Sequence, residues 1–385
     1  MKKFSEIPIN REEINQCALN ISNKVRSNIF TWNGQFSPQF IEELLNKYAK
    51  PDDTVLDPFL GSGTVLYECA RMNLSAYGVE LNASAYFMAK TYELVNSSFT
   101  ERKEYLYHID IFINSILHDE EIIPKLLEFK DSQEPPISNI ISLLVILLDI
   151  YNNEITLDFL QKKWDDLKQI FNALPYTEKK ISALMGDSRN IELPNDLADL
   201  LITSPPYVNV FNYHQKYRRS VEVLGFNVLS IAKTEFGSNR KNRGNRLLTV
   251  IQYCIDMALA MYESSRICKE NARMIYVVGR ESSVLGYSFC NSELIYEIGV
   301  NVLNFDFSLR QERVFKNRYG QLIYEDILHF SNIKHDYNEQ EIIEQSKKIA
   351  EKVLNEKITI DSKNATFLSD AILNIYKVKK SEVCI

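Results

Sequence analysis

A glycine-rich turn that follows a short apolar run places the strongest constraint on how this chain can fold. The run from Thr54 to Leu56 is typical of a buried strand, and it ends in Asp57. Gly61-Ser62-Gly63 predicts a tight turn, after which Thr64 begins a helix. The apolar positions of that helix recur at helical spacing: Val65, Leu66, Cys69 and Ala70. A strand, a glycine turn and a helix in this order form the first half of a βαβ unit.

An acidic residue marks the end of the second strand of this unit. Ser75–Val79 is the second strand-like run, and Glu80 follows it, 23 positions after Asp57. At this spacing the acidic side chain of a βαβ unit meets the hydroxyl groups of a ribose. The segment therefore predicts a nucleoside-binding half-site.

The glycine turn lacks the residues that grip phosphate. A phosphate-binding loop ends in Gly-Lys-Ser/Thr, whereas Gly63 is followed here by Thr64 and Val65. A dinucleotide-binding fold needs a third glycine, and Leu66 stands at that position. S-adenosylmethionine is a nucleoside whose charges are a sulfonium and an amino acid group, so it suits this loop better than either phosphate ligand.

A second motif, Ser204-Pro205-Pro206-Tyr207, comes soon after the apolar run Leu200–Ile202. Open α/β sheets bind ligands at the carboxyl ends of their strands, which is where this motif is expected. Ser204 offers a hydroxyl oxygen and Pro205 a carbonyl oxygen, and together these could hold both hydrogens of an exocyclic base amine. Tyr207 offers an aromatic face for a displaced base. The alternative interpretation is a polyproline turn without a chemical role.

Four motifs, in this order, resemble those of the DNA amino-methyltransferases, which modify the exocyclic nitrogen of cytosine or adenine. They are DPFLGSGT (57–64), YGVELN (77–82), GDSRNI (186–191) and TSPPY (203–207). Upstream, GQFSPQFIEELLNKYAKPDD resembles the helix that precedes the first strand in members with an N-terminal tenth motif. Downstream, NARMIYVVGR and RVFKNRYGQLIYEDILHF resemble the later strands of the same sheet. The resemblance covers roughly residues 28–95 and 180–332.

The resemblance implies an α/β fold, a doubly wound Rossmann-like methyltransferase sheet with a helical insertion and a C-terminal helical tail. It implies S-adenosylmethionine as cofactor and duplex DNA, with a flipped base, as substrate. It places Ser204, Pro205, Pro206 and Tyr207 at the reacting amine. It places these residues at the cofactor: Phe36, Asp57, Pro58, Phe59, Gly61, Ser62, Gly63, Thr64, Glu80, Leu81, Asn82, Asp187 and Ser188.

The first residue of the clamp bears on the choice of base. Serine is commoner in the cytosine N4 members of the family and Asp or Asn in the adenine N6 members, so Ser204 favours cytosine N4. That rule has exceptions in both directions, and adenine N6 is the alternative. Two further alternatives are an RNA amino-methyltransferase and a non-catalytic nucleic-acid-binding subunit of the same fold. The resemblance also implies a restriction-modification setting and a cognate restriction endonuclease as partner.

The chain divides into four segments in this interpretation. They are an N-terminal segment with the cofactor-binding half (1–95), a helical insertion (96–180), the catalytic half (181–332) and a helical tail (333–385). The insertion reads as three helices, IPKLLEFK, SNIISLLVILLDIYN and LDFLQKKWDDLKQIFNAL, with a break at Pro135-Pro136. Further expected elements are a helix at 248–268, a strand at 274–278, a turn at 317–320 and a helix at 339–357. The insertion could help to read the target sequence, or serve structure or a partner.

Charge is distributed unevenly along the chain. The formal net charge of the 385 residues is −7, which by itself opposes a nucleic-acid partner. Residues 208–246, directly after the proline motif, carry eight basic and two acidic side chains, a net +6. We expect this basic segment to contact DNA through Lys216, Arg218, Arg219, Arg240, Lys241, Arg243 and Arg246. The alternative is a solvated basic surface loop.

The cysteines and the apolar stretches argue against a metal-binding, membrane or secreted protein. The six cysteines form no CxxC pair and have no histidine at ligand spacing, so we expect reduced thiols and no metal. No apolar stretch is long enough to span a bilayer, and the N-terminus lacks the apolar core of a secretory signal. We therefore expect a cytoplasmic protein. Its oligomeric state is not indicated.

Overall fold

The fold is organised around one seven-stranded sheet. A computed structural model describes residues 3–208, 215–236, 244–317, 319–358 and 363–383. The strands are β1 (Thr54–Asp57), β2 (Ser75–Glu80), β3 (Ile181–Met185), β4 (Ala198–Thr203), β5 (Cys268–Gly279), β8 (Asp306–Lys316) and β9 (Leu322–Ser331). Their spatial order is β3-β2-β1-β4-β5-β9-β8. The first five run parallel, and β9 is antiparallel to both β5 and β8. The predicted doubly wound α/β fold is confirmed.

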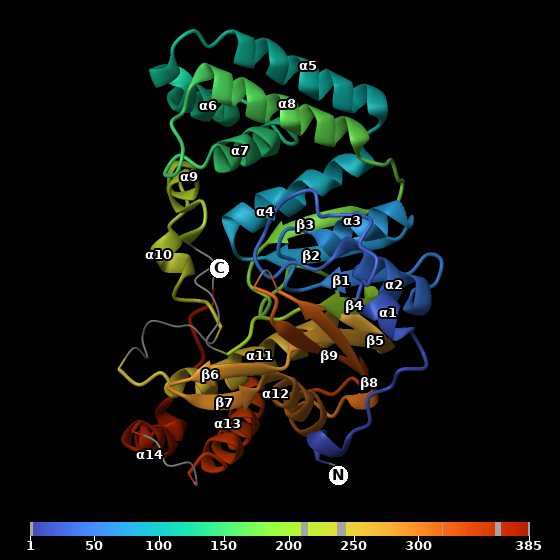
Figure 1. Ribbon diagram of the computed structural model, residues 1–385, viewed down its shortest axis with the longest axis vertical. Coiled ribbons are helices and arrows are strands. Elements are labelled where there is room, and N and C mark those ends of the chain that lie inside the picture. The colour runs from blue at the N-terminus through green and yellow to red at the C-terminus, as the bar shows by residue number, and fades with distance from the viewer. Residues whose placement is uncertain (1–2, 209–214, 237–243, 318, 359–362, 384–385) are drawn as a thin grey trace.

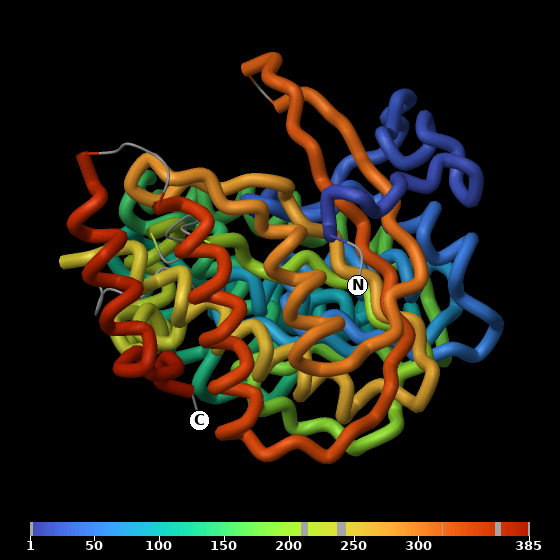
Figure 2. The backbone as a smooth tube through the Cα atoms, turned by 90° about the horizontal axis from the view of Figure 1, so that it is seen from below, coloured from blue at the N-terminus to red at the C-terminus, as the bar shows by residue number. Residues whose placement is uncertain are grey.

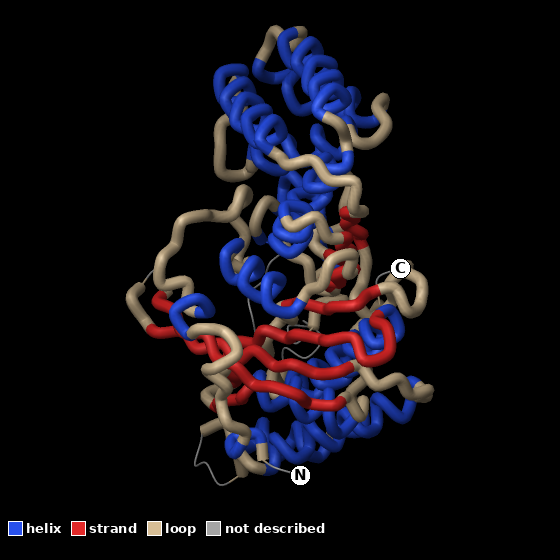
Figure 3. The backbone as a smooth tube through the Cα atoms, turned by 90° about the vertical axis from the view of Figure 1, so that its right-hand side faces the viewer, coloured by secondary structure: helices blue, strands red, loops and turns tan. Residues whose placement is uncertain are grey.

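Helices cover both faces of the sheet (Figures 1 and 3). Those on one face are α2 (Pro38–Tyr48), α3 (Thr64–Arg71) and α4 (Ala83–Lys90), and those on the other are α11 (Leu248–Ile267), α12 (Asn291–Glu297) and α13 (Glu339–Asn355). Side chains of a strand alternate between the two faces. In β4, Leu200 and Ile202 join the first core while Leu201 joins the second. The strand is therefore buried on both faces, as parallel sheets require.

Four helices between α4 and β3 form a layer beyond the first face of the sheet (Figure 1). They are α5 (Phe99–Asn114), α6 (Ile122–Asp131), α7 (Ile137–Leu148) and α8 (Leu157–Ala173). α6, α7 and α8 were predicted, but α5 was missed. Its apolar residues lie on more than one side, with Leu106 and Ile109 buried but Tyr107 and Ile111 exposed, so its periodicity is weak. The division of the chain into separate domains stays a prediction.

Two short helices connect the motif after β4 with this layer. α9 (Arg218–Val223) and α10 (Val228–Ile231) follow the proline motif along the chain. α9 contacts α7, and the N–H of Ile150 donates to Ser220 Oγ at 3.2 Å. The helical layer therefore extends to the side of the sheet from which the proline motif departs (Figure 1).

The C-terminal half adds two hairpins and a helical tail. The β8–β9 hairpin projects from the body of the protein (Figure 2), with the expected turn closed by a bond from the Gly320 N–H to the Asn317 carbonyl at 2.9 Å. A smaller hairpin pairs β6 (Glu281–Val284) with β7 (Tyr287–Cys290). The helix expected at 248–268 ends at Ile267, one residue before β5 begins. The helix expected at 339–357 ends at Asn355. α14 (Ala365–Leu373) was not predicted.

The described residues include neither a membrane-spanning helix nor a disulfide bond. None of their helices is long and apolar enough to cross a membrane. Their five cysteines, at positions 17, 69, 254, 268 and 290, are all free thiols.

A buried histidine on β9 contacts side chains of both neighbouring strands, β8 and β5. The Nε2 atom of His329 lies 2.9 Å from Gln311 Oε1, and its Nδ1 atom lies 3.3 Å from Arg273 Nη1. Burial lowers the pKa of His329 to about 3, and the Arg273 guanidinium acts in the same direction. The imidazole is therefore neutral in the folded protein at all ordinary pH values.

This neutral histidine makes folding sensitive to acid. An unfolded histidine takes up a proton near pH 6.5, so the stability that His329 provides is present above that pH and is lost as the pH falls toward 3. We expect the free energy of unfolding to fall between pH 7 and 5 by about 2 kcal/mol more in the wild type than in His329→Gln. Denaturant titrations of both proteins measure this difference. Parallel pH profiles would contradict the neutral assignment.

Candidate active site

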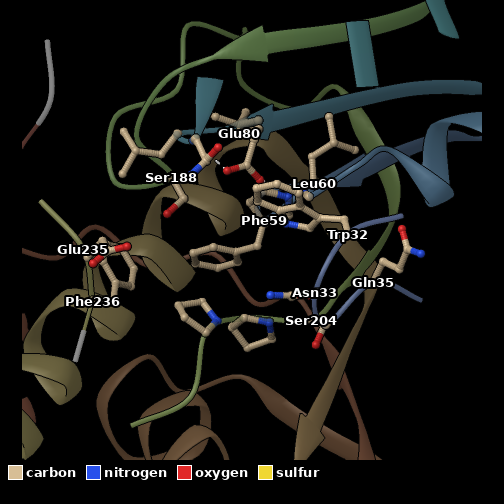
Figure 4. A pocket seen from close by; sticks show the side chains of 18 of the residues that line it. Trp32, Asn33, Gln35, Phe59, Leu60, Glu80, Ser188, Ser204, Glu235 and Phe236 are labelled. Carbon is tan, nitrogen blue, oxygen red and sulfur yellow. Dashed lines mark hydrogen bonds between the residues drawn. The ribbon is translucent and has the colours of Figure 1, made fainter. Parts of the chain in front are cut away.

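A cavity of about 220 Å³ lies at the carboxyl ends of the central strands (Figure 4). Predicted residues line it from five chain segments that the fold brings together: Phe36, Pro58, Phe59, Gly61, Thr64, Glu80, Leu81, Asn82, Asp187, Ser188, Ser204, Pro205, Pro206 and Tyr207. Ligands of doubly wound sheets bind at this edge, where the strand order reverses. The reversal falls between β1 and β4, which are direct neighbours in the sheet. The two sequence motifs therefore open into one cavity.

The glycine turn has the backbone that only glycine adopts readily. Gly61 and Gly63 have φ values of 55° and 87°. A Cβ atom at Gly63 would lie 2.8 Å from the Tyr92 ring and 2.9 Å from Ala89. Gly63 caps the start of α3, so the turn, the helix start and the neighbouring α4 pack against each other without side-chain space. This close packing holds the loop 58–61 at the cavity.

Glu80 closes the other side of the glycine turn. Its Oε2 atom accepts from the Gly61 N–H at 2.7 Å, and its Oε1 atom accepts from the Asn82 N–H at 2.7 Å. The two bonds fix the carboxylate at the end of β2, on the cavity wall. A carboxylate is an acceptor-only group, which is the kind of partner that a ligand hydroxyl can donate to.

Three residues predicted to contact the cofactor stand behind the cavity wall and are not among its lining residues. Asp57 is 1% exposed, and its Oδ1 atom accepts from Thr203 Oγ1 at 2.6 Å and from the Phe59 N–H at 3.1 Å. Ser62 turns its hydroxyl to Gln35 Oε1 at 2.7 Å. Gly63, the third residue, packs against Tyr92 and Ala89. These residues shape the site and do not line it.

Burial also changes the acidity of Asp57. It raises the pKa of this carboxyl to about 7, against the opposing effect of the hydrogen bonds from Thr203 and Phe59. The bond from Thr203 joins the ends of β1 and β4, the strands that lead into the two motifs.

The proline motif is held from behind by two fully buried side chains. The hydroxyl of Tyr253 on α11 donates to the Pro206 carbonyl at 2.9 Å. Asn291 at the start of α12 accepts from the Val208 N–H at 3.2 Å and donates to the Gly279 carbonyl at 3.0 Å. Sequence reasoning found neither residue, because both are far from the motif in the chain and carry no pattern of their own.

The ring of Tyr207 packs against the backbone of β5. A Cβ atom at Gly279 would lie 2.6 Å from the Tyr207 ring, closer than real side chains approach. Only glycine at position 279 leaves space for the ring in this position. The motif therefore has a defined shape, with Tyr207 on the cavity wall.

Several lining residues were missed from the sequence. Trp32, Asn33 and Gln35 directly precede Phe36, so a wider search of the upstream segment could have found them. Glu235 and Phe236 come from the segment after α10, and no motif marks them. The Phe236 ring meets the Phe59 ring edge-on, with the centroids 5.6 Å apart. Aromatic side chains thus form much of the wall (Figure 4).

The predicted DNA-contacting residues have different surroundings. Lys216 donates to the Thr31 carbonyl at 2.6 Å and lies over the Trp32 ring, so it binds the N-terminal segment. Arg218 pairs with Glu222 at 2.8 Å, whereas Arg219 and Arg246 are exposed. The predicted residues Arg240, Lys241 and Arg243 lie outside the described residues.

Comparison with known proteins gives a match for the part of the chain that carries the glycine turn. A family model described as DNA methylase matches residues 10–91, which contain the glycine turn, Glu80 and α4. This match supports the predicted DNA amino-methyltransferase family. This match covers the cofactor-binding half of the cavity, and the proline motif completes it from β4.

Named relatives share parts of the chain. Over 54 residues it is 35% identical to the type II methyltransferase M.MjaII of Methanocaldococcus jannaschii. These residues make up 14% of this chain and 10% of that protein. It is 24% identical over 342 positions to the type II methyltransferase M.MvaI of Kocuria varians, covering 64% of this chain and 74% of that one. A solved S-adenosylmethionine-dependent methyltransferase from Methanosarcina mazei covers 76% of this chain and 98% of its own, with 10% identity and a TM-score of 0.38.

The family takes S-adenosylmethionine as its cofactor, and the cavity suits that ligand. Its walls are largely aromatic and aliphatic, as suits an adenosine, and Glu80 and Asp187 are among the lining residues. Sites of three or more acidic, cysteine or histidine ligands for a metal are absent from the described part of the chain.

Replacing Glu80 with Gln should raise the Kd of S-adenosylmethionine at least tenfold. In its predicted role Glu80 makes a charge-assisted bond to the ribose diol, worth about 1.5–3 kcal/mol, and the amide would lose the charge. Titration calorimetry without DNA measures this Kd. Glu93→Gln is the matched control, because Glu93 also accepts from a backbone N–H, that of Ala183 at 2.8 Å, but does not line the cavity. Equal Kd values for the two variants would remove Glu80 from the cofactor site.

Proposed function

We propose that this protein transfers a methyl group from S-adenosylmethionine to the exocyclic amine of a base displaced from duplex DNA. The observation that carries the proposal is the single cavity lined by both Glu80 and the Ser204–Tyr207 motif. A cofactor held at the first can present its methyl group to an amine held at the second. When bound, S-adenosylmethionine supplies an electrophilic methyl group on a positively charged sulfur.

An exocyclic base amine is a weak nucleophile, because its lone pair is delocalised into the ring. Two acceptors that hold both amine hydrogens turn the lone pair out of conjugation and toward the methyl carbon. Ser204 Oγ and the Pro205 carbonyl are the acceptors in this proposal. The amine nitrogen forms the new C–N bond, the C–S bond breaks with its electron pair left on sulfur, and one amine proton then leaves to solvent.

Tyr207 and its supports position the base. Stacking on an aromatic ring contributes roughly 1–3 kcal/mol, which offsets part of the few kcal/mol needed to extrude a base. Tyr253 fixes the Pro206–Tyr207 peptide unit, and Asn291 fixes the backbone that follows it. These bonds keep the motif in one shape before substrate arrives, which avoids an ordering cost during the reaction.

Cytosine N4 is the favoured target in this proposal, and adenine N6 is the alternative. Support comes from Ser204 at the first motif position. Both amines present two hydrogens to two acceptors, so the motif chemistry serves either.

The basic segment 208–246 is the proposed DNA-contacting surface, rather than the helical insertion. The segment carries a net +6 and begins directly at the proline motif. Residues 96–180 carry nine basic and fifteen acidic side chains, a net −6, which opposes contact with phosphates. The insertion is more suited to supporting α9 through the Ile150–Ser220 bond.

The proposed setting is a restriction-modification system with a cognate endonuclease. Support comes from the two relatives, both of which are named as type II methyltransferases. Methylation by this chain would then protect the host DNA from its partner.

Nucleoside analysis tests the proposed function. The purified protein is incubated with methyl-tritiated S-adenosylmethionine and unmethylated bacterial DNA, and the digested nucleosides are separated by chromatography. We expect label in N4-methylcytosine. Label in N6-methyladenine would keep the reaction and reject the assigned base. Cofactor binding without labelled DNA would reject DNA methylation by the isolated chain, and RNA substrate would then be tried.

Tyr253→Phe should lower kcat for methyl transfer about tenfold, with little change in the Kd of S-adenosylmethionine. The variant removes only the hydroxyl that holds the Pro206 carbonyl, leaving a buried acceptor unpaired at a cost of about 1–3 kcal/mol. Tyr262→Phe on the same helix is the control, since its hydroxyl donates to the Tyr337 carbonyl away from the cavity. A wild-type kcat for Tyr253→Phe would show that the motif holds its shape without this bond.

Replacing Arg240, Lys241 and Arg243 together with Ser should flatten the salt dependence of DNA binding. Each phosphate that the protein no longer neutralises lowers the slope of log K against log salt concentration by about 0.9. Lys125, Lys162 and Lys163 of the insertion form the matched triple control. An unchanged slope in the first variant, or a flattened one in the control, would contradict the assigned DNA surface.

A further inference from the structure

Arg189 is a buried cation that the proposed chemistry does not use. Its side chain is 1% exposed, and it lies two residues beyond Asp187 of the cavity wall. Its Nε and Nη2 atoms donate to the two carboxylate oxygens of Asp187 at 2.9 and 2.6 Å. Its Nη1 atom donates to Asp256 on α11 at 2.8 Å. One guanidinium thus joins two fully buried carboxylates from different elements.

The last part of the described chain completes this cluster. We refer to residues 378–383 as the strap, since they run from the tail helices along α11 toward α10 (Figure 1). Ser381, which is 2% exposed, donates its N–H to Asp256 Oδ1 at 3.0 Å and its hydroxyl to Asp256 Oδ2 at 2.7 Å. Arg189 in turn donates to Ser381 Oγ and to the Glu382 carbonyl. The strap is therefore bonded to both other members of the cluster.

The same guanidinium also reaches a second part of the cavity wall. It donates to the Thr234 carbonyl at 3.3 Å, and it lies 4.8 Å from the centre of the Phe236 ring. Phe236 lines the cavity and meets Phe59 from the glycine-turn segment. Arg189 thus touches two lining residues, Asp187 and Phe236, that belong to separate chain segments.

Such a cluster is stable only when it is complete. A buried charge is costly to leave unpaired, and removing one partner of a buried pair destabilises strongly. Burial raises the pKa of Asp256 to about 6, while Arg189 and the hydrogen bonds from Ser381 oppose that rise. Removal of the Ser381 hydroxyl would leave Asp256 with fewer donors and Arg189 with one acceptor fewer. The position of Asp187 and Phe236 then becomes less well defined.

We infer that Arg189 and Ser381 are positioning residues for the cofactor cavity, and that the strap sets cofactor affinity by fixing Asp187 and Phe236. This inference rests on S-adenosylmethionine as the ligand of the proposed function. Neither residue touches the reacting atoms. Their effect should appear in binding of the cofactor and should leave the methyl-transfer step itself unchanged.

Ser381→Ala is the decisive variant, because it removes one hydroxyl and no charge. We expect the Kd of S-adenosylmethionine, measured by calorimetry without DNA, to rise five- to tenfold. The KM for S-adenosylmethionine should rise in parallel, while kcat at saturating cofactor stays within twofold of the wild type. Arg189→Lys, which keeps the charge but not the fork of donors, should raise the Kd further.

Ser346→Ala provides the control for a loss of stability alone. Ser346 is also fully buried and donates its hydroxyl to the Ile342 carbonyl on α13, away from the cavity. Thermal unfolding of all variants shows which are folded. If Arg189→Lys does not fold, the Kd of Ser381→Ala alone tests the inference. A wild-type Kd in Ser381→Ala, or an equal rise in Ser346→Ala, would overturn the inference.

The same titration separates this inference from the proposed function. If the wild-type protein binds S-adenosylmethionine but labels no nucleoside, DNA methylation is rejected. The inference that the strap sets cofactor affinity would still stand. A wild-type protein that does not bind S-adenosylmethionine would overturn both.

Discussion

The reversal of strand order between β1 and β4 is the constraint on which the site depends. The chain builds β1, β2 and β3 in one direction across the sheet, and then returns to add β4 and β5 on the other side of β1. Loops that leave β1 and β4 therefore diverge, and a cavity opens between them. The bond from Thr203 to Asp57 joins the two strands at this point. Glu80, Asp187 and Ser204 meet here although long stretches of chain separate them.

The parts of the fold that follow from local pattern could be predicted. Apolar runs indicated β1, β2, β4 and β5, and an acidic or proline-containing motif directly after a strand pointed to Glu80 and the Ser204–Tyr207 segment, which line the cavity. Position relative to a strand end is enough in these cases, because the carboxyl ends of parallel strands share one edge. Asp57 shows the limit of this reasoning. It follows a strand too, but its carboxylate turns to Thr203 behind the wall, a choice that depends on the neighbouring strand.

Residues fixed by distant partners could not be predicted. Arg189 stands inside the third motif, yet its partners Asp256 and Ser381 are 67 and 192 positions away. Tyr253 and Asn291 act on the proline motif from helices whose place in the fold the motif does not indicate. Helix α5 was missed for a different reason, since its apolar side chains are shared between the buried face and solvent. In each case the missing information is tertiary packing.

The contact between Gly279 and the Tyr207 ring also bears on how this site can diverge. The two positions share one volume, because the ring occupies the space that a side chain at 279 would fill. A larger residue at 279 is therefore compatible only with a smaller or displaced group at 207. Variation at a backbone position of β5 can in this way reshape the proposed base-binding surface from the inside, without any change to the residues proposed to hold the cofactor.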